Sequence, residues 1–176
     1  KSRTVVIGYD RRFLAPELAE AIAAAVRGCE LEPLLTDTAV PTPACSWAVV
    51  ERKALGALVI TASHNPPEWL GLKIKGPFGG SVEGDFTAAV ERRLAAGGIT
   101  APIKAQVPRF DGRGEHLEGL RRKLDLNALV EGLKAINLKV IVDPMHGSAA
   151  GGVTELLGPE AAGGVEEIRS ERDPLF

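Results

Sequence analysis

The sequence predicts a layered α/β fold in which helices flank a sheet, followed by an incomplete second α/β domain. Short apolar, β-prone segments alternate with longer segments whose apolar residues recur at helical spacing. Residues 99–114, rich in proline and glycine, show no clear period and separate two such sets of segments. We therefore expect a first domain at residues 1–100, a linker at 101–114 and a partial second domain at 115–176.

The expected elements of the first domain follow from these patterns and from their stop signals. The helix at Ala15–Gly28 has Pro16 in its first turn and a glycine at its end. Pro33 makes a central position awkward for a strand within Cys29–Asp37, because proline cannot donate to a sheet ladder. Further strands are expected at Arg3–Asp10, Gly56–Ala62 and Leu72–Gly76, and further helices at Pro41–Leu55 and Glu83–Gly98.

Beyond the linker the same alternation begins again. Helices are expected at Glu115–Leu124 and Leu126–Ala135. A strand, a turn and a helix follow over Asn137–Gly158, and another strand begins within residues 163–176. Alternating strands and helices of this kind imply right-handed crossover connections.

Three of the predicted strands end in polar, turn-forming clusters. These are GYDRR (Gly8–Arg12), TASHNP (Thr61–Pro66) and DPMHG (Asp143–Gly147). Ligands of open α/β sheets bind outside the carboxyl ends of the strands. We therefore expect a functional site to be built from these clusters.

Composition and charge exclude several classes of function. The 176 residues are 45% apolar and 25% charged, as in soluble globular proteins. A net charge of −2 gives no electrostatic footprint for nucleic acid, and no apolar run is long enough to span a bilayer. Cys29 and Cys45 are too few for a disulfide framework and lack metal-ligand spacing. The composition favours a cytoplasmic protein with no nucleic-acid or membrane partner.

The TASHNP turn carries the most specific chemistry of the chain. Ser63 follows a predicted buried strand, and Pro66 and Pro67 stiffen the loop, which lowers the entropy cost of positioning its hydroxyl. His64 could move protons, and Lys73 could return to the same site. A solvated turn and a Ser-His hydrolase remain alternatives, although no G-x-S-x-G elbow is present.

The segment TASHNPPEWLGLKIKGPFGG (Thr61–Gly80) resembles the active-site serine loop of the α-D-phosphohexomutases, the phosphoglucomutase/phosphomannomutase superfamily. The agreement extends to GYDRR, to VPTPACSWAV (Val40–Val49) and to VIVDPMHGSAAG (Val140–Gly151), in the same order along the chain. The resemblance implies the layered domain of these enzymes, with the phosphoserine loop at residues 61–67.

The resemblance also implies roles for individual residues. Ser63 matches the serine that carries the transferable phosphoryl group, whose phosphate also binds Mg²⁺. His64 matches a neighbouring active-site histidine, and Lys73 matches a candidate general acid/base. Arg12 matches an active-site arginine near the phosphoserine, and Asn65 is expected to contact substrate.

The implied reaction interconverts the 1- and 6-phosphates of a hexose, glucose or mannose, through a hexose 1,6-bisphosphate. Catalysis of phosphoryl transfer rests on positioning and on neutralising the charge of the equatorial oxygens. Mg²⁺, Arg12 and Lys73 are expected to supply that positive charge.

One departure from the family limits what this chain is expected to do alone. The family has four domains and a DGD-x-DR type loop with metal-binding aspartates, and this sequence holds no such motif. We expect the chain to correspond to most of the first domain, without its N-terminal strand and helix, and to the start of the second. The isolated chain should therefore not turn over sugar phosphate. The alternative is a non-catalytic α/β module that binds phosphorylated ligands or partners.

Overall fold

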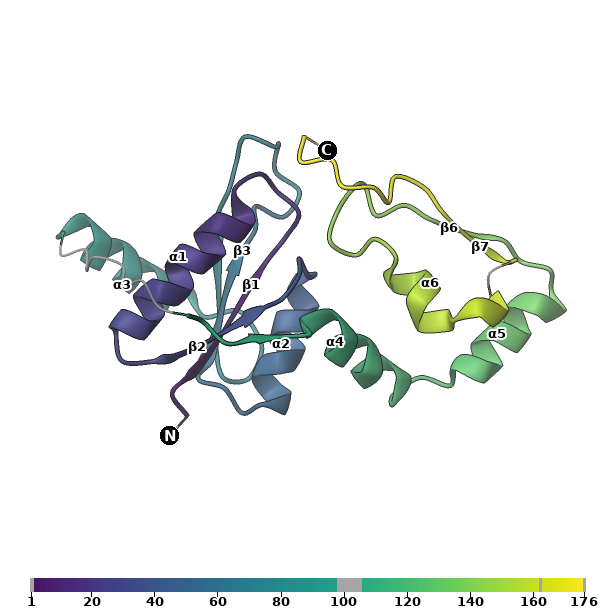
Figure 1. Ribbon diagram of the computed structural model, residues 1–176, viewed down its shortest axis with the longest axis horizontal. Coiled ribbons are helices and arrows are strands. Elements are labelled where there is room, and N and C mark those ends of the chain that lie inside the picture. The colour runs from purple at the N-terminus through teal and green to yellow at the C-terminus, as the bar shows by residue number, and fades with distance from the viewer. Residues whose placement is uncertain (1, 98–105, 162, 176) are drawn as a thin grey trace.

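The computed structural model describes residues 2–97, 106–161 and 163–175 and forms two α/β units (Figure 1). Its strands are β1 (Thr4–Tyr9), β2 (Glu32–Thr36), β3 (Gly56–Ile60), β4 (Leu72–Lys75), β5 (Arg109–Phe110), β6 (Val140–Val142) and β7 (Val165–Glu167). Its helices are α1 (Ala15–Gly28), α2 (Thr42–Glu51), α3 (Gly84–Ala95), α4 (Gly112–Arg121), α5 (Leu126–Ala135) and α6 (Gly152–Leu157), with a short 3₁₀ helix, η1 (Pro159–Ala161).

The first unit is built on a five-stranded sheet in the order β4-β3-β1-β2-β5. The pairs of β1 with β2 and β3, and of β2 with β5, are parallel, whereas the edge strand β4 runs antiparallel to β3. Pro33 pairs with Val5 of β1, but β5 reaches only Leu35 and Thr36. Among the described strands, β2 is therefore still an edge strand at Pro33, and this is where a sheet tolerates proline.

Two helices cover the two faces of this sheet and bury its core. α1 packs its alanines, including Ala19 and Ala23, against the face that carries Ile7 and Ile60. α2 packs against the opposite face, where Val6, Val59 and Cys45 are buried. The backbone comes so close there that a Cβ on Gly8 would lie 2.2 Å from Cys45 Sγ. The result is the predicted layered fold, with helices on both sides of the sheet.

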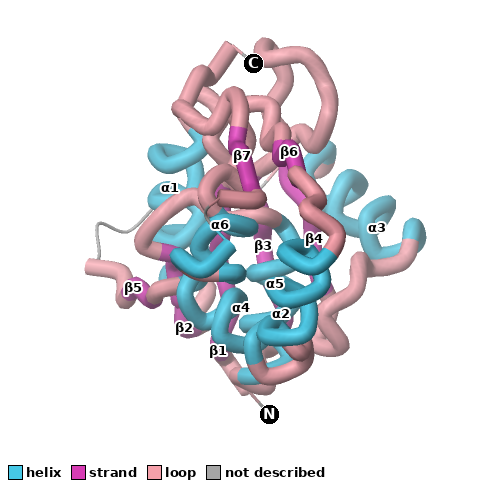
Figure 2. Tube along the Cα trace, turned by 90° about the vertical axis from the view of Figure 1, so that its right-hand side faces the viewer, coloured by secondary structure: helices cyan, strands magenta, loops and turns pink. Residues whose placement is uncertain are grey.

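The second unit is attached to the first through α4. This helix lies against α2, where Gly119 faces the ring of Trp47 and Lys123 Nζ lies 4.9 Å from the ring centroid. From the other side of α4, Arg113 donates to Glu155 Oε2 at 2.8 Å and to the Ala150 carbonyl at 2.8 Å. The rest of the second unit consists of the two-stranded parallel sheet of β6 and β7 and the helices α5 and α6 (Figure 2).

The predicted elements agree with the structure in most places. α1 and α5 have the predicted bounds, and each predicted strand contains an observed one. The predicted linker at 101–114 differs, because its described part holds β5, which extends the first sheet, and the start of α4. Helix formation starts at Gly112 because the Asp111 side chain accepts a hydrogen bond from the Gly114 N–H at 2.7 Å. Residues 101–105 of that prediction lie outside the described residues.

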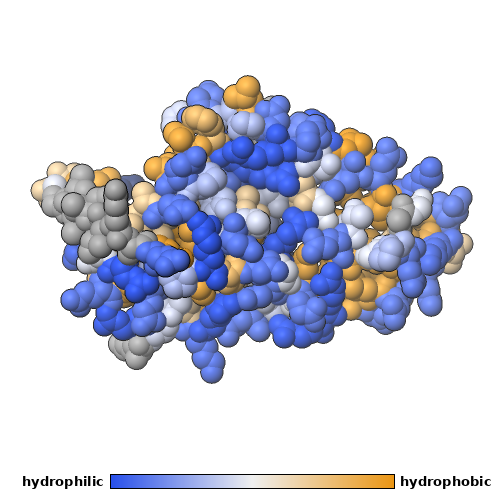
Figure 3. Space-filling model, in the orientation of Figure 1, coloured by the Kyte–Doolittle hydropathy of each residue, from blue (hydrophilic) through white to orange (hydrophobic). Residues whose placement is uncertain are grey.

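Apolar side chains are exposed on the second unit. Ile136 is 71% exposed and Ile141 66%, and apolar surface shows in the half of the molecule that holds α5, β6 and β7 (Figure 3).

Within the described ranges, no helix combines the length and the apolar character needed to cross a membrane.

Candidate active site

The three polar strand ends singled out in the sequence meet at one pocket of about 110 Å³. Asp10 and Arg11 line it from the end of β1, Thr61 and Ser63 from the end of β3, and Gly147 and Ser148 from the loop after β6. Val40 and Thr42 complete the lining at the start of α2. This is a small polar pocket, and a phosphoryl group is small enough to enter it.

Ser63 has a strained backbone and an exposed side chain. Its φ of 58° is left-handed, a conformation that costs a residue with a Cβ about 1–2 kcal/mol. The loop compensates by hydrogen bonds, because the Ser63 N–H donates to Thr61 Oγ1 at 3.0 Å and the Asn65 N–H to the Ala62 carbonyl at 3.0 Å. Strain held by its surroundings at an exposed nucleophile is typical of a functional site.

Arg12 supports the serine loop through hydrogen bonds to its backbone. Its side chain is 2% exposed, and its guanidinium donates to the carbonyl oxygens of Ser63 (3.0 Å), Asn65 (2.7 Å), Pro66 (2.9 Å) and Trp69 (3.1 Å). Asp10 binds Arg12 in turn, accepting from its N–H at 3.0 Å and lying 3.4 Å from its Nε. A buried cation that contacts four loop carbonyls fixes the path of the loop.

The pocket itself is lined by Arg11, which sequence reasoning missed. The sequence singled out its neighbour Arg12, but consecutive residues leaving a strand point in different directions. The structure places Arg12 under the loop and Arg11 beside Ser63. The signal available in the sequence was the pair of arginines in GYDRR.

The other predicted site residues, His64, Asn65 and Lys73, do not line the pocket. His64 and Asn65 are exposed on the loop, and within the described residues no hydrogen bond joins the His64 ring to Ser63. β4 places Lys73 directly opposite Val59 of β3, and directly opposite residues share a face of the sheet. Val59 packs against α2, so Lys73 also lies on the face of the sheet that α2 covers. Thr42, the first residue of α2, lines the pocket.

No metal centre is formed by the described part of the chain. It contains no group of three or more His, Cys, Asp or Glu side chains that could hold a metal ion. Thus these residues by themselves do not fit the expected Mg²⁺. DPMHG instead forms a structured turn, in which Asp143 accepts from the Met145 N–H at 2.9 Å and from Arg169 Nε at 2.9 Å. The Arg169 hydrogen bond lowers the pKa of Asp143.

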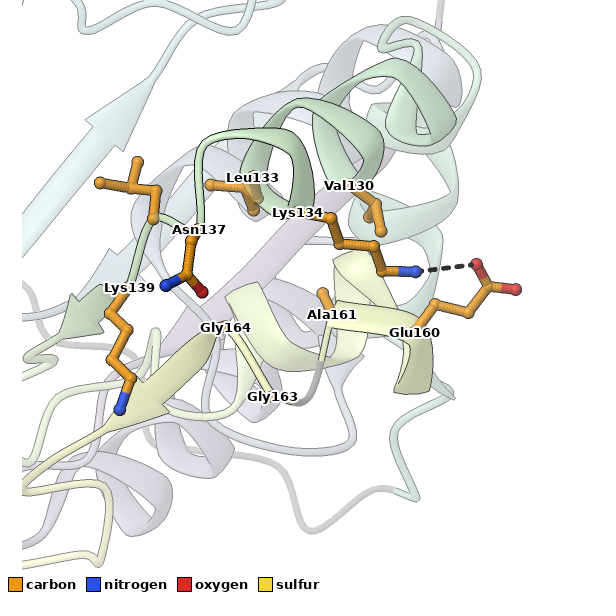
Figure 4. A pocket seen from close by; sticks show the side chains of 10 residues that line it. Val130, Leu133, Lys134, Asn137, Lys139, Glu160, Ala161, Gly163 and Gly164 are labelled. Atoms are coloured by element: carbon orange, nitrogen blue, oxygen red, sulfur yellow. Dashed lines mark ion pairs between the residues drawn. The ribbon is translucent and has the colours of Figure 1, made fainter.

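A larger cavity of about 220 Å³ lies elsewhere, between α5 and the segment that includes η1 (Figure 4). Lys134 and Glu160 project from its two sides and lie 3.8 Å apart as an ion pair. Val130 and Leu133 supply apolar lining. This cavity does not include Ser63 or the other polar strand ends, so the smaller pocket is the candidate active site.

Comparison with known proteins agrees with this geometry. The family model for phosphoglucomutase/phosphomannomutase, alpha/beta/alpha domain I, matches residues 1–99. A phosphoglucomutase of Staphylococcus epidermidis is 30% identical over 97% of the chain. A crystal structure of a protein assigned as a phosphomannomutase from Thermus thermophilus superposes with a TM-score of 0.85 at 35% identity, over 98% of this chain and 38% of that one. A phosphoglucomutase/phosphomannomutase family protein of Burkholderia thailandensis superposes with a TM-score of 0.77 at 25% identity, over 98% of this chain and 37% of that one.

The family model covers most of the first unit, and the Staphylococcus epidermidis relative and the two solved structures match 97–98% of the chain. The chain therefore belongs to the phosphoglucomutase/phosphomannomutase family, as the resemblance of the serine loop implied. It spans about a third of the length of its curated relatives, 32% of the Staphylococcus epidermidis enzyme and 29% of one from Staphylococcus aureus.

Proposed function

We propose that this chain is the serine-bearing part of a phosphohexomutase that interconverts hexose 1-phosphate and hexose 6-phosphate. The observation that carries the proposal is the position of Ser63. It is exposed on a strained loop, lines a small polar pocket that a phosphoryl group can enter and faces residues from two other strand ends. Membership of the family supports a phosphoryl carrier at this position.

In the proposed reaction, Ser63 carries a phosphoryl group as a phosphoserine. The bond from phosphorus to Ser63 Oγ breaks as a bond forms to the free hydroxyl of the hexose phosphate. That hydroxyl gives its proton to the general base, and Ser63 Oγ takes up a proton as it leaves. The hexose 1,6-bisphosphate then reorients, and its other phosphoryl group returns to Ser63. Lys73 is proposed as the acid/base, and His64 and Asn65 as neighbouring contacts of the substrate.

Arg12 acts in this proposal by positioning. Its guanidinium binds the carbonyls of the serine loop, so it fixes the direction from which Ser63 presents the phosphoryl group. Such orientation is a large part of what an enzyme contributes to phosphoryl transfer. A bound Mg²⁺ would supply positive charge that neutralises the phosphoryl oxygens.

The alternatives make different predictions for Ser63. A Ser-His hydrolase needs a base hydrogen-bonded to the serine, and the exposed His64 makes no such bond within the described residues. A non-catalytic module that binds phosphorylated ligands would use the same pocket with Ser63 unmodified. A cytoplasmic location remains part of the proposal, and the free thiols of Cys29 and Cys45 are consistent with it.

The proposal is tested by mutase assays of the protein purified from its natural source, with glucose 1-phosphate and mannose 1-phosphate as substrates. Ser63→Ala should abolish interconversion. Ser148→Ala removes another hydroxyl from the same pocket and should leave activity measurable. The isolated 176-residue chain should show no turnover. Activity that survives in Ser63→Ala would contradict the phosphoserine mechanism.

A further inference from the structure

Arg11 occupies a position that the proposed mechanism does not use. It follows β1, lines the same pocket as Ser63 and is only partly exposed. One of its guanidinium nitrogens, Nη1, donates to the Ser170 carbonyl at 2.7 Å. Within the described ranges, no carboxylate lies at ion-pair distance from this guanidinium, whose fork offers five N–H donors.

The segment that follows β7 holds Arg11 in place from the second unit. Arg172 Nε donates to the Arg11 carbonyl at 3.0 Å, and Arg172 Nη2 to the Arg12 carbonyl at 3.3 Å. Together with the bond from Arg11 to Ser170, these contacts join the loop after β1 to residues 170–172. The segment at residues 170–172 therefore holds both the Arg11 side chain, through the Ser170 carbonyl, and the Arg11 backbone, through Arg172. Within the described residues, the remaining donors of the Arg11 fork have no hydrogen-bond partner and can bind a ligand.

The surroundings of Arg11 carry an excess of positive charge. Partial burial is the main cause that lowers the pKa of Arg11, and the nearby charges of Arg113 and Arg172 lower it further. Glu167 opposes this effect, but both of its carboxylate oxygens accept from the Gly151 N–H at 2.8 Å. Asp10 also lines the pocket, where Arg12 neutralises it, and Glu155 pairs with Arg113. Among these groups, Arg11 and Arg172 then face Glu167 alone, so one positive charge remains in excess. An anion in the pocket would relieve this excess.

We propose that Arg11 binds the oxygens of the phosphoryl group carried on Ser63, with the Ser170 carbonyl and Arg172 as the groups that position it. This inference rests on the proposed function, because it takes Ser63 as the phosphoryl carrier. The two neighbouring arginines then have different roles. Arg12 binds the backbone carbonyls of the serine loop, and Arg11 binds the negatively charged phosphoryl group on Ser63. Planar guanidinium groups suit phosphate because two parallel N–H bonds can reach two oxygens.

The test measures the ionisation of a phosphoserine that is installed at position 63 during translation, by suppression of an amber codon. The phosphate titrates with a second pKa of about 6 when it is solvated, and ³¹P NMR follows it. A bound guanidinium favours the dianion, so the parent chain should titrate below that value. Arg11→Gln should raise the phosphoserine pKa by about one unit. Arg11→Lys should raise it less, because the charge remains.

Arg122→Gln is the matched control, because it removes the same charge at the C-terminal end of α4, where Arg122 pairs with Glu51 of α2 and does not line the pocket. The phosphoserine pKa should not change in this variant. Equal titration of the parent and Arg11→Gln would overturn the proposal, as would a parent phosphoserine that titrates like the solvated amino acid. Translation installs the phosphate, so this outcome does not depend on mutase activity. A failure of the mutase assay would count against the proposed function alone.

Discussion

Arg12 illustrates how one residue determines the geometry of the serine loop. Its guanidinium bonds to four loop carbonyls while its side chain is almost fully buried. Arg12→Met removes these charge-assisted bonds, each worth about 1.5–3 kcal/mol against unsatisfied partners. Since the exposed loop can recover part of this through water, we expect a loss of about 2–3 kcal/mol in urea-induced unfolding. Arg122→Met should cost less than about 1 kcal/mol, and similar losses in both variants would contradict the assigned role.

Cys45 gives a prediction about the pH dependence of stability. Burial raises the pKa of this thiol to about 12, whereas an unfolded cysteine ionises near 8.5. Above about pH 9 the unfolded chain releases this proton and the folded chain retains it. Stability should therefore fall with rising pH by up to about 1.4 kcal/mol per unit from this group, until the folded thiol also ionises. The unfolding free energies of the parent and Cys45→Ala should diverge between about pH 8 and 10, and parallel curves would contradict the assignment.

The contact between α2 and α4 is the element-scale feature that joins the two units. A Cβ on Gly119 of α4 would lie 2.2 Å from the Trp47 ring. Gly119→Ala gains about 1 kcal/mol of helix propensity, but overpacking costs about 1–3 kcal/mol, so we expect net destabilisation by thermal unfolding. Gly132→Ala in α5 meets no atom within 4 Å and should stabilise the protein by about 0.5–1 kcal/mol. A Gly119→Ala variant as stable as Gly132→Ala would show that this packing is loose.

The sequence predicted elements best where local signals mark both ends. Pro16 and Gly28 bracket α1, and the structure has the predicted bounds. β5 was not predicted, because a two-residue strand has no period of its own and exists only through its pairing with β2. Pro33 indicated that β2 is not a central strand at that residue, and the strand order agrees: among the described strands β2 has a neighbour on one side only at Pro33.

At the scale of the whole molecule, the pocket exists only because two units meet. Arg172→Ala removes the two bonds from Arg172 to the carbonyls of Arg11 and Arg12, while the core around α1 and α2 keeps its contacts. Amide hydrogen exchange of residues 168–173 and of Arg11 and Arg12 should therefore become faster, with β1 and β3 unchanged. Faster exchange throughout the sheet would mean that Arg172 supports the first unit as a whole.

The candidate site was predicted in outline by a general rule about sheets. Parallel strands end at one edge, so the polar clusters after β1, β3 and β6 could be expected to form a site, and all three line one pocket. Which of two adjacent arginines enters that pocket depends on the direction of each side chain after the strand. Lys73 was expected near Ser63, and its place on the α2 face follows only from the register of β4 against β3.

Intact-mass spectrometry of the protein from its natural source tests most directly whether Ser63 carries a phosphoryl group. Peptide mapping would then assign the modified residue. We predict one phosphoryl group located on Ser63, and none in the Ser63→Ala variant. A Ser63 that is unmodified, and that stays unmodified after incubation with a hexose 1,6-bisphosphate, would contradict this claim.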